Sequence, residues 1–236
     1  MTQPIAVVTG AGGGVGSACV SEFRTAGFWT VGVDVKPASD ADEHLRVDMA
    51  SSSCGKEIAA GIGGRQVTVL VNNAAVGADS TLLEATAESW DALMAVNLRA
   101  PLLTAQAVQP LLAASGQGSI VNISSVHALA SSPGVGVYAT SKAGLIALTR
   151  AMALEWAPEV RANCVIPGAV DTPMIRFGLE RTGQTVEEIG RRHPLGRIAA
   201  PSEIAQVVRF VAVDATFMTG SALVVDGGVL SRLSSE

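Results

Sequence analysis

Short apolar runs rich in β-branched residues recur along the chain, and segments of helix length separate them. The runs lack the period-two alternation of a half-exposed strand, so we expect strands that are buried on both faces. They cover residues 5–9, 28–34, 67–72, 119–124, 161–167 and 222–227, with a shorter strand near 45–47. Strands that alternate with helices pair in parallel through right-handed crossovers. The pattern predicts an α/β fold, a doubly wound parallel sheet of about seven strands with helices on both faces.

The segments between the runs carry helix signals. A helix over 15–26 would end at Gly27, the usual residue just past a helix end. The segment 89–114 contains Pro101 and Pro110, so we expect an interrupted or kinked helix there. Further helices are expected over 52–60, 138–156 and 201–213. No shift in composition marks a second domain, so residues 1–236 are expected to form one domain, with a polar substrate flap at 174–198 that interrupts the alternation.

The composition excludes several classes of protein. Hydrophobic residues make up 48% of the 236 residues and the formal charge is −5, which argues against a nucleic-acid-binding surface. The sequence has no apolar run of roughly 18 residues and no signal-peptide pattern, so we expect no membrane segment. Three widely spaced cysteines without a CxxC pair indicate reduced thiols. A cytoplasmic location is expected.

A glycine-rich loop follows the first predicted strand. Its sequence TGAGGGVG, residues 9–16, fits the pattern TGxxxGxG and precedes a predicted helix. Glycine lets the backbone approach a bulky anion, and the start of the helix offers free N–H groups and the positive end of its dipole. A glycine-rich turn without a ligand would look similar, but the position between the first strand and the first helix favours dinucleotide binding.

An acidic residue closes the second predicted strand. Asp34 follows Gly16 by 18 residues, where a carboxylate can accept hydrogen bonds from the hydroxyls of the adenosine ribose. The same carboxylate would repel a 2′-phosphate, and the glycine loop contains no arginine or lysine. These features favour NAD over NADP, although Asp34 alone could be an ordinary turn residue.

The chain has a single tyrosine, and a lysine follows it four residues later. On a helix, Tyr138 and Lys142 lie one turn apart on one face. A free phenol has a pKa of about 10, and a neighbouring ammonium favours the phenolate, which would make the tyrosine a usable acid and base. Such a pair is more often an ordinary helix surface, so its interpretation depends on the surrounding motifs.

Those motifs occur in order along the whole chain and resemble the short-chain dehydrogenase/reductase family. The glycine loop is followed by VDM at 47–49, NNAA at 72–75, MAVNLRAP at 94–101, NISS at 122–125, YATSK at 138–142, IPGAVDTPM at 166–174 and TGSALVVDGG at 219–228. Ser125 precedes Tyr138 by 13 residues, the spacing usual in the family. The resemblance implies a Rossmann-type fold with strand order 3-2-1-4-5-6-7 and a nicotinamide cofactor.

The resemblance also assigns catalytic roles. Tyr138 would be the general acid and base, and Lys142 would hydrogen-bond the nicotinamide ribose. Ser125 would bind the substrate oxygen. The backbone carbonyl of Asn97 would help to hold a water that relays protons. His127 lies two residues after Ser125, where the family's substrate pocket is lined, so it is a candidate substrate contact together with Ser125 and Tyr138.

The cofactor-binding residues implied by the resemblance come from several motifs. Asn73 matches the cofactor-ribose position, while Asn72 is expected to tie neighbouring strands together. Ala75 departs from the glycine usual at the end of that motif. The complete expected set is Gly10, Gly13, Gly14, Val15, Gly16, Asp34, Asp48, Met49, Asn73, Tyr138, Lys142, Val170 and Thr172. His44, His127 and His193 are scattered, so no metal site is expected.

The predicted function is NAD-dependent hydride transfer between the cofactor and a secondary alcohol or ketone. One alternative is an NADPH-dependent 3-oxoacyl reductase with the same catalytic residues. Two others are a non-catalytic dinucleotide sensor and a scaffold. The resemblance implies a homo-oligomer, a tetramer or a dimer, that uses the helix over 138–156 and the one around 100–114. Small residues Ala143, Ala147 and Ala151 would allow close approach there.

Overall fold

The computed structural model describes residues 3–38, 40–77 and 80–232. Its centre is a seven-stranded sheet in the order β3-β2-β1-β4-β5-β6-β7, and every neighbouring pair is parallel. The strands are β1 (Ile5–Thr9), β2 (Trp29–Val33), β3 (Glu43–Leu45), β4 (Val69–Asn72), β5 (Gly118–Ile123), β6 (Val160–Pro167) and β7 (Ala222–Val225). All residues of β1, β4 and β5 are buried, which confirms strands covered on both faces.

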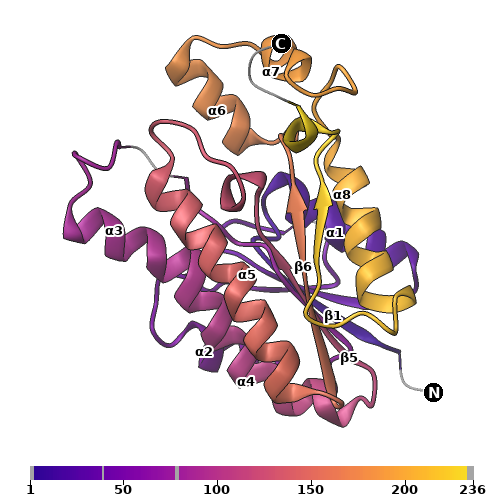
Figure 1. Ribbon diagram of the computed structural model, residues 1–236. Helices are drawn as coiled ribbons and strands as arrows, with labels where there is room; N and C mark the ends of the chain where they lie inside the picture. The colour runs from indigo at the N-terminus through magenta and orange to yellow at the C-terminus, as the bar shows by residue number, and fades with distance from the viewer. Residues whose placement is uncertain (1–2, 39, 78–79, 233–236) are drawn as a thin grey trace.

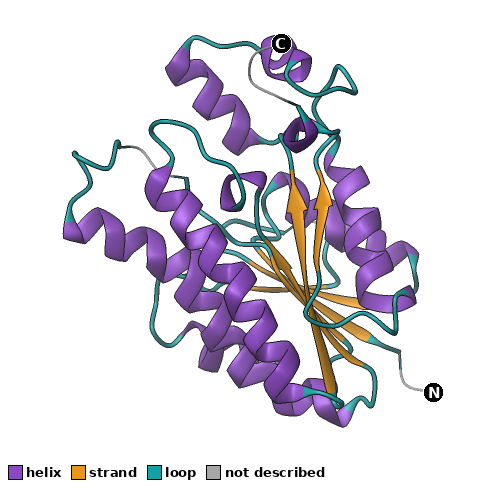
Figure 2. Cartoon of the chain, in the orientation of Figure 1, coloured by secondary structure: helices purple, strands orange, loops and turns teal. Residues whose placement is uncertain are grey.

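Helices cover both faces of the sheet (Figure 1, Figure 2). One face carries α2 (Cys54–Ile62), α4 (Ala100–Ala114) and α5 (Gly136–Trp156), and the other carries α1 (Gly14–Thr25) and α8 (Pro201–Arg209). Each layer has its own apolar core. Ile58, Leu112 and Met152 belong to the first, and Phe23, Ile204 and Val208 belong to the second.

The strand order reverses between β1 and β4. The chain moves outward from β1 to β2 and β3, then returns to place β4 on the other side of β1. At such a point the two crossover connections leave in opposite directions, and a crevice opens beyond the carboxyl ends of the strands. The glycine loop follows β1 directly, so the fold places it at this crevice.

The predicted interruption of the segment 89–114 is present, but its form differs from a proline kink. The segment divides into α3 (Ala87–Met94), a π-helical turn (Ala95–Arg99) and α4. Pro101 stands in the first turn of α4, and Pro110 lies inside α4 without ending it. Because Pro101 has no N–H, it donates nothing to the carbonyl four residues earlier, which is that of Asn97.

Two further expectations need adjustment. The strand predicted near 45–47 is β3 at Glu43–Leu45, because its register pairs Val31 of β2 with Glu43. The segment 174–198, for which the sequence predicts a polar substrate flap, is mostly helical, and its role as a flap stays a prediction. It contains α6 (Pro173–Thr182) and α7 (Val186–Arg191), whose buried Leu179 and Ile189 pack with Ile198. These helices lie beyond the arrowheads of β6 and β7 in Figure 1.

Candidate functional site

The glycine loop folds closely on itself between β1 and α1. Gly10 has a φ of +68°, and its N–H donates to the Val33 carbonyl at 2.8 Å. A Cβ on Gly16 would lie 2.0 Å from the Gly10 carbonyl oxygen, so no other residue fits there. Gly13 is the N-cap of α1, and no side chain caps this helix among the described residues. The first-turn N–H groups of Gly14 and Val15 are therefore available for a phosphate.

Thr172 lies against the glycine loop at Gly14. A Cβ on Gly14 would lie 2.8 Å from the methyl carbon of Thr172, so only a glycine allows the two segments to approach this closely. The Thr172 hydroxyl also accepts the Ile175 N–H at 3.3 Å and caps α6. Val170 is buried just before it and pairs with Ala199 through an isolated parallel bridge. The structure thus brings Thr172 to the glycine loop, while Val170 is held in the core beside Ala199.

Asp34 lies against the glycine loop. One carboxylate oxygen accepts the Gly12 N–H at 3.0 Å, and the other accepts the Lys36 N–H at 2.9 Å. These two bonds hold the carboxylate beside the loop. The contact of Asp34 with a cofactor ribose stays a prediction.

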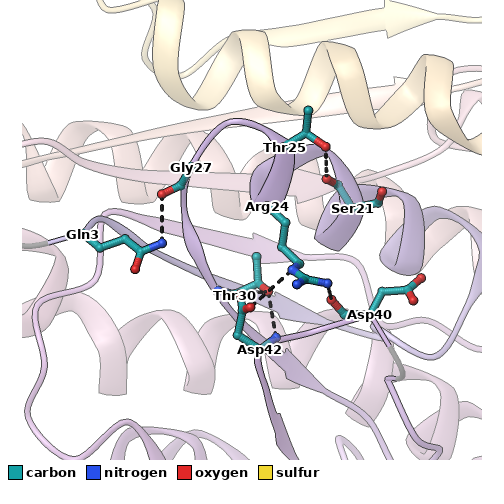
Figure 3. A network of polar contacts seen from close by, with 8 residues as sticks. All are labelled: Gln3, Ser21, Arg24, Thr25, Gly27, Thr30, Asp40 and Asp42. Carbon is teal, nitrogen blue, oxygen red and sulfur yellow. Dashed lines mark hydrogen bonds and ion pairs between the residues drawn. The ribbon is translucent and has the colours of Figure 1, made fainter.

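A polar network that the sequence did not reveal anchors the segment after Asp34 (Figure 3). Arg24, in the last turn of α1, donates to the Asp40 carbonyl at 2.7 Å and lies 3.3 Å from the Asp42 carboxylate. Thr30 donates its N–H and its hydroxyl to the other Asp42 oxygen at 2.9 and 2.8 Å. Burial acts to raise the pKa of Asp42, but the Thr30 bonds and Arg24 outweigh it and leave the pKa lowered. The network keeps residues 40–42 fixed beside α1 and β2.

Two residues expected at the adenine lie in unequal environments. Asp48 is exposed, and its carboxylate accepts the Ala50 N–H at 2.9 Å, which closes its own turn. The Met49 side chain is only 7% exposed and packs in the core beneath the sheet. Any contact of Met49 with an adenine would therefore come from its backbone.

Asn73 holds the glycine loop to the end of β4, and its direct contact with a cofactor ribose stays a prediction. Both hydrogens of its side-chain amide are used, donating to the Thr9 carbonyl at 3.0 Å and the Gly10 carbonyl at 3.1 Å. Only its amide oxygen is left for a ribose. Asn72 has the role predicted for it, since its amide donates to the Asn122 oxygen on the neighbouring strand at 2.8 Å.

Tyr138, Lys142 and Ser125 meet where β5 ends and α5 begins. Ser125 follows the carboxyl end of β5, its side chain accepts the His127 N–H at 3.2 Å, and its interaction with the Tyr138 phenol acts to lower the pKa of that phenol. The Lys142 Nζ lies 5.7 Å from the centre of the Tyr138 ring and donates to the Ile123 carbonyl at 2.9 Å. The His127 ring meets the Tyr138 ring edge-on, with centroids 6.2 Å apart. The structure brings these four predicted residues together.

The electrostatics of the pair differ from the sequence expectation. Burial raises the pKa of Tyr138 above 10, and the Ser125 hydrogen bond offsets this only in part. Lys142 is 2% exposed, and burial lowers its pKa to about 8, with a smaller opposing effect from Cys164. The amine lies over the ring and bonds the Ile123 carbonyl instead of the phenol oxygen. In this state Tyr138 is a protonated acid, and the lowered pKa that we expect for it is absent.

Asn97 lies in the π-helical turn and is fully buried. Its amide oxygen accepts the Val76 N–H at 2.8 Å, and its amide nitrogen donates to the Val76 carbonyl at 2.9 Å and to Ser141 on α5 at 3.2 Å. The side chain therefore joins the turn to the loop after β4 and to the helix of Tyr138. Its backbone carbonyl, released by Pro101, is the group that the sequence assigned to a water.

His127 is half-buried and lies beside the acid of the site. Burial lowers its pKa, so its neutral form is favoured, and a backbone interaction with Ala130 offsets this in part. A neutral imidazole beside Tyr138 can donate or accept a hydrogen bond. This geometry keeps His127 a candidate substrate contact.

No group of three or more histidine, cysteine, aspartate or glutamate side chains that could hold a metal ion occurs among the described residues. In the same part of the chain, no helix combines the length and the apolar character needed to cross a membrane.

The sequence and the fold of the chain are similar to those of known oxidoreductases. Residues 10–230 match a family model described as enoyl-(acyl carrier protein) reductase. An uncharacterized short-chain type dehydrogenase/reductase of Sinorhizobium fredii is 40% identical over 96% of this chain, but the chain spans only 44% of that relative's length. A 3-oxoacyl-[acyl-carrier-protein] reductase of Thermotoga maritima is 40% identical over 70% of this chain and 67% of its own.

Among solved structures, the ligand-free aldohexose dehydrogenase of Thermoplasma acidophilum superposes with a TM-score of 0.94. It is 32% identical, and the match covers 99% of this chain and 96% of that one. The chain therefore belongs to the short-chain dehydrogenase/reductase family of oxidoreductases, whose members use nicotinamide cofactors.

Proposed function

We propose that the protein transfers a hydride between NAD and a secondary alcohol or its ketone, with Tyr138 as the general acid and base. The observation that carries this proposal is the meeting of a partly buried Tyr138 with Ser125 and a buried Lys142 amine, which lies 5.7 Å from the centre of the tyrosine ring. The glycine loop also supports the proposal. A side chain at Gly14 or Gly16 would clash with Thr172 or with the Gly10 carbonyl, so the loop presents bare backbone that the phosphates of a dinucleotide can approach, with Asp34 beside it.

The residues would divide the chemistry as follows. When bound, the nicotinamide accepts or donates the hydride. Tyr138 gives its proton to the carbonyl oxygen in reduction and takes it back in alcohol oxidation. Ser125 donates a hydrogen bond to the same oxygen and stabilises the charge that develops there. The Asn97 carbonyl holds a water through which protons reach solvent from Lys142.

A Tyr138→Phe variant tests the assignment. General acid–base catalysis contributes about 10²- to 10⁴-fold, so we expect turnover to fall by roughly this factor. Binding of reduced dinucleotide, followed by its fluorescence, should change less than about twofold because the ring remains in place. The assay is absorbance of the reduced nicotinamide with a panel of secondary alcohols, aldohexoses and 3-oxoacyl thioesters. Full activity of the variant on any substrate that the wild type uses would contradict the proposal.

The preference for NAD rests on Asp34. Its carboxylate lies beside the glycine loop, where a 2′-phosphate would meet a negative charge, and the loop itself has no basic residue. The rival function is that of an NADPH-dependent 3-oxoacyl reductase. We test it because the relative from Thermotoga maritima is named a 3-oxoacyl-[acyl-carrier-protein] reductase. The exposed Lys36 lies two residues after Asp34 and is a feature that would favour NADP.

Asp34→Ser should therefore weaken the binding of NAD and improve the binding of NADP. A hydrogen bond to a charged group contributes about 1.5–3 kcal/mol, so we expect the KM for NAD to rise roughly 10- to 100-fold. The measurement is kcat/KM with each dinucleotide. Asp91→Ser, which removes an exposed carboxylate on α3, is the matched control and should change neither value. A wild type that prefers NADP strongly would show that Asp34 does not select the cofactor.

The substrate class is supported by one comparison and the site's own chemistry. The structural relative from Thermoplasma acidophilum is an aldohexose dehydrogenase, and His127 offers a polar contact beside Tyr138 that a second hydroxyl could use. We therefore place hydroxylated cyclic alcohols first in the panel. A non-catalytic dinucleotide sensor remains the rival from another class, and would bind the dinucleotide without turnover of any substrate.

We also propose a homo-oligomer, a dimer or tetramer, through the outer faces of α4 and α5. A hollow there is lined by Leu102, Leu148 and Trp156, and neighbouring Leu154 is 84% exposed. Light scattering should give a molecular mass that is a multiple of the 24.0 kDa of one chain, and Leu154→Glu should lower this mass. Leu83→Glu, at a residue 99% exposed on a loop, is the control. A monomeric wild type would contradict this proposal.

A further inference from the structure

A line of buried side-chain hydrogen bonds crosses from the sheet to α5. The Asn72 amide donates to Asn122 at 2.8 Å, the Asn122 amide donates to the Thr149 hydroxyl at 2.8 Å, and that hydroxyl donates to the Leu145 carbonyl at 2.7 Å. The three side chains are 2%, 0% and 1% exposed. They belong to β4, β5 and α5 in turn, so the line joins three elements.

The line begins beside the glycine loop. Asn73, which follows Asn72 directly, donates to the Thr9 and Gly10 carbonyls. At its other end, Thr149 is seven residues after Lys142, which is close to two helical turns, so both side chains face the sheet. The same hydrogen bonds therefore connect the loop that would hold the dinucleotide to the helix that carries Tyr138 and Lys142.

The sequence retains polar groups here although burying them is costly. A buried amide or hydroxyl is unfavourable unless it is paired, and the Asn72 oxygen has no partner among the residues that the structure describes. The apolar contacts of α5 are not directional and would tolerate a small shift along the helix axis. The Asn122–Thr149 hydrogen bond is directional, and geometry this restrictive fixes where the helix lies on the sheet.

We propose that the Asn122–Thr149 pair is a positioning device that sets the place of α5, and so the distance of Tyr138 and Lys142 from the glycine loop. Neither residue touches the reacting atoms, so both act through the helix. The inference rests on the proposed function, because the distance of Tyr138 and Lys142 from the glycine loop matters only if these two residues act beside a bound dinucleotide.

Thr149→Val tests the proposal because it keeps the shape and removes the hydroxyl. The Asn122 amide nitrogen would then keep only the Met152 sulfur, at 4.0 Å, as an acceptor among the described residues, while the Asn122 oxygen would still accept the Asn72 hydrogen bond. We expect kcat to fall about tenfold, since small misplacements of reacting groups are costly, while KM for NAD changes less than about twofold. Amide hydrogen exchange in residues 136–149 should become faster without any ligand. Thr149→Ser, which restores the hydroxyl, should recover both values.

Thr140→Val is the matched control. Thr140 is on the same helix, and its hydroxyl donates to the Gly136 carbonyl in the same i−4 arrangement, but it is exposed and makes no bond to the sheet. This variant should leave kcat and exchange unchanged. If Thr149→Val does not fold, Thr149→Ala opens space for a water at Asn122 and should show a smaller loss of kcat.

The outcomes separate the two proposals. A Thr149→Val protein that is less stable but keeps full kcat and normal exchange around Tyr138 would overturn the positioning role. A wild type that turns over no substrate would refute the proposed function instead. The exchange experiment needs no substrate, so faster exchange with serine rescue would still support the positioning role in that case.

Discussion

The parallel arrangement of all seven strands is the constraint on which the rest of the structure depends. Parallel strands end at one edge of the sheet, so the loop after β1 and the serine after β5 are brought to the same side. The reversal of order between β1 and β4 opens the crevice at that edge. Residues far apart in the sequence, such as Gly10, Ser125 and Thr172, therefore lie at the same edge of the sheet.

Burial governs the chemistry at that edge. Lys142 is almost completely buried, which lowers its pKa to about 8, and the pKa of Tyr138 is raised by the same cause. A buried ammonium needs a partner, and the Ile123 carbonyl supplies one. The phenol therefore keeps its proton in the structure described here, and an added positive charge near its oxygen is required before it can act as a base at neutral pH.

Much of the fold and site follows from patterns that are local in the sequence. The doubly buried strands, the glycine loop, Asp34 and the Tyr138–Lys142 pair are each specified by neighbouring residues. What could not be predicted depends on contacts between distant segments. Asn73, just after β4, contacts the Gly10 carbonyl just after the neighbouring β1, and Arg24 contacts Asp40 and Asp42 from another element. The sign of the Tyr138 pKa shift also depends on burial, which the sequence does not state.

The π-helical turn at Asn97 lies between these cases. Pro101 indicated an interruption, but its position relative to Asn97 became meaningful only once the turn and its contact with Ser141 were known. The two helices of residues 174–198 were missed because their polar surfaces conceal a small core of Leu179, Ile189 and Ile198. In both places the local sequence held part of the signal. It did not show which distant residues pack against the segment.

The chain contains a single tyrosine, so the ultraviolet absorbance of tyrosinate reports on Tyr138 alone. The most direct measurement is a pH titration of that absorbance, in the range where circular dichroism remains native. We predict a pKa above 10 in the free protein, a clear decrease when oxidised NAD binds, and little change with the uncharged ring of reduced NAD. An ordinary pKa of about 10 that neither form of the dinucleotide alters would contradict the account.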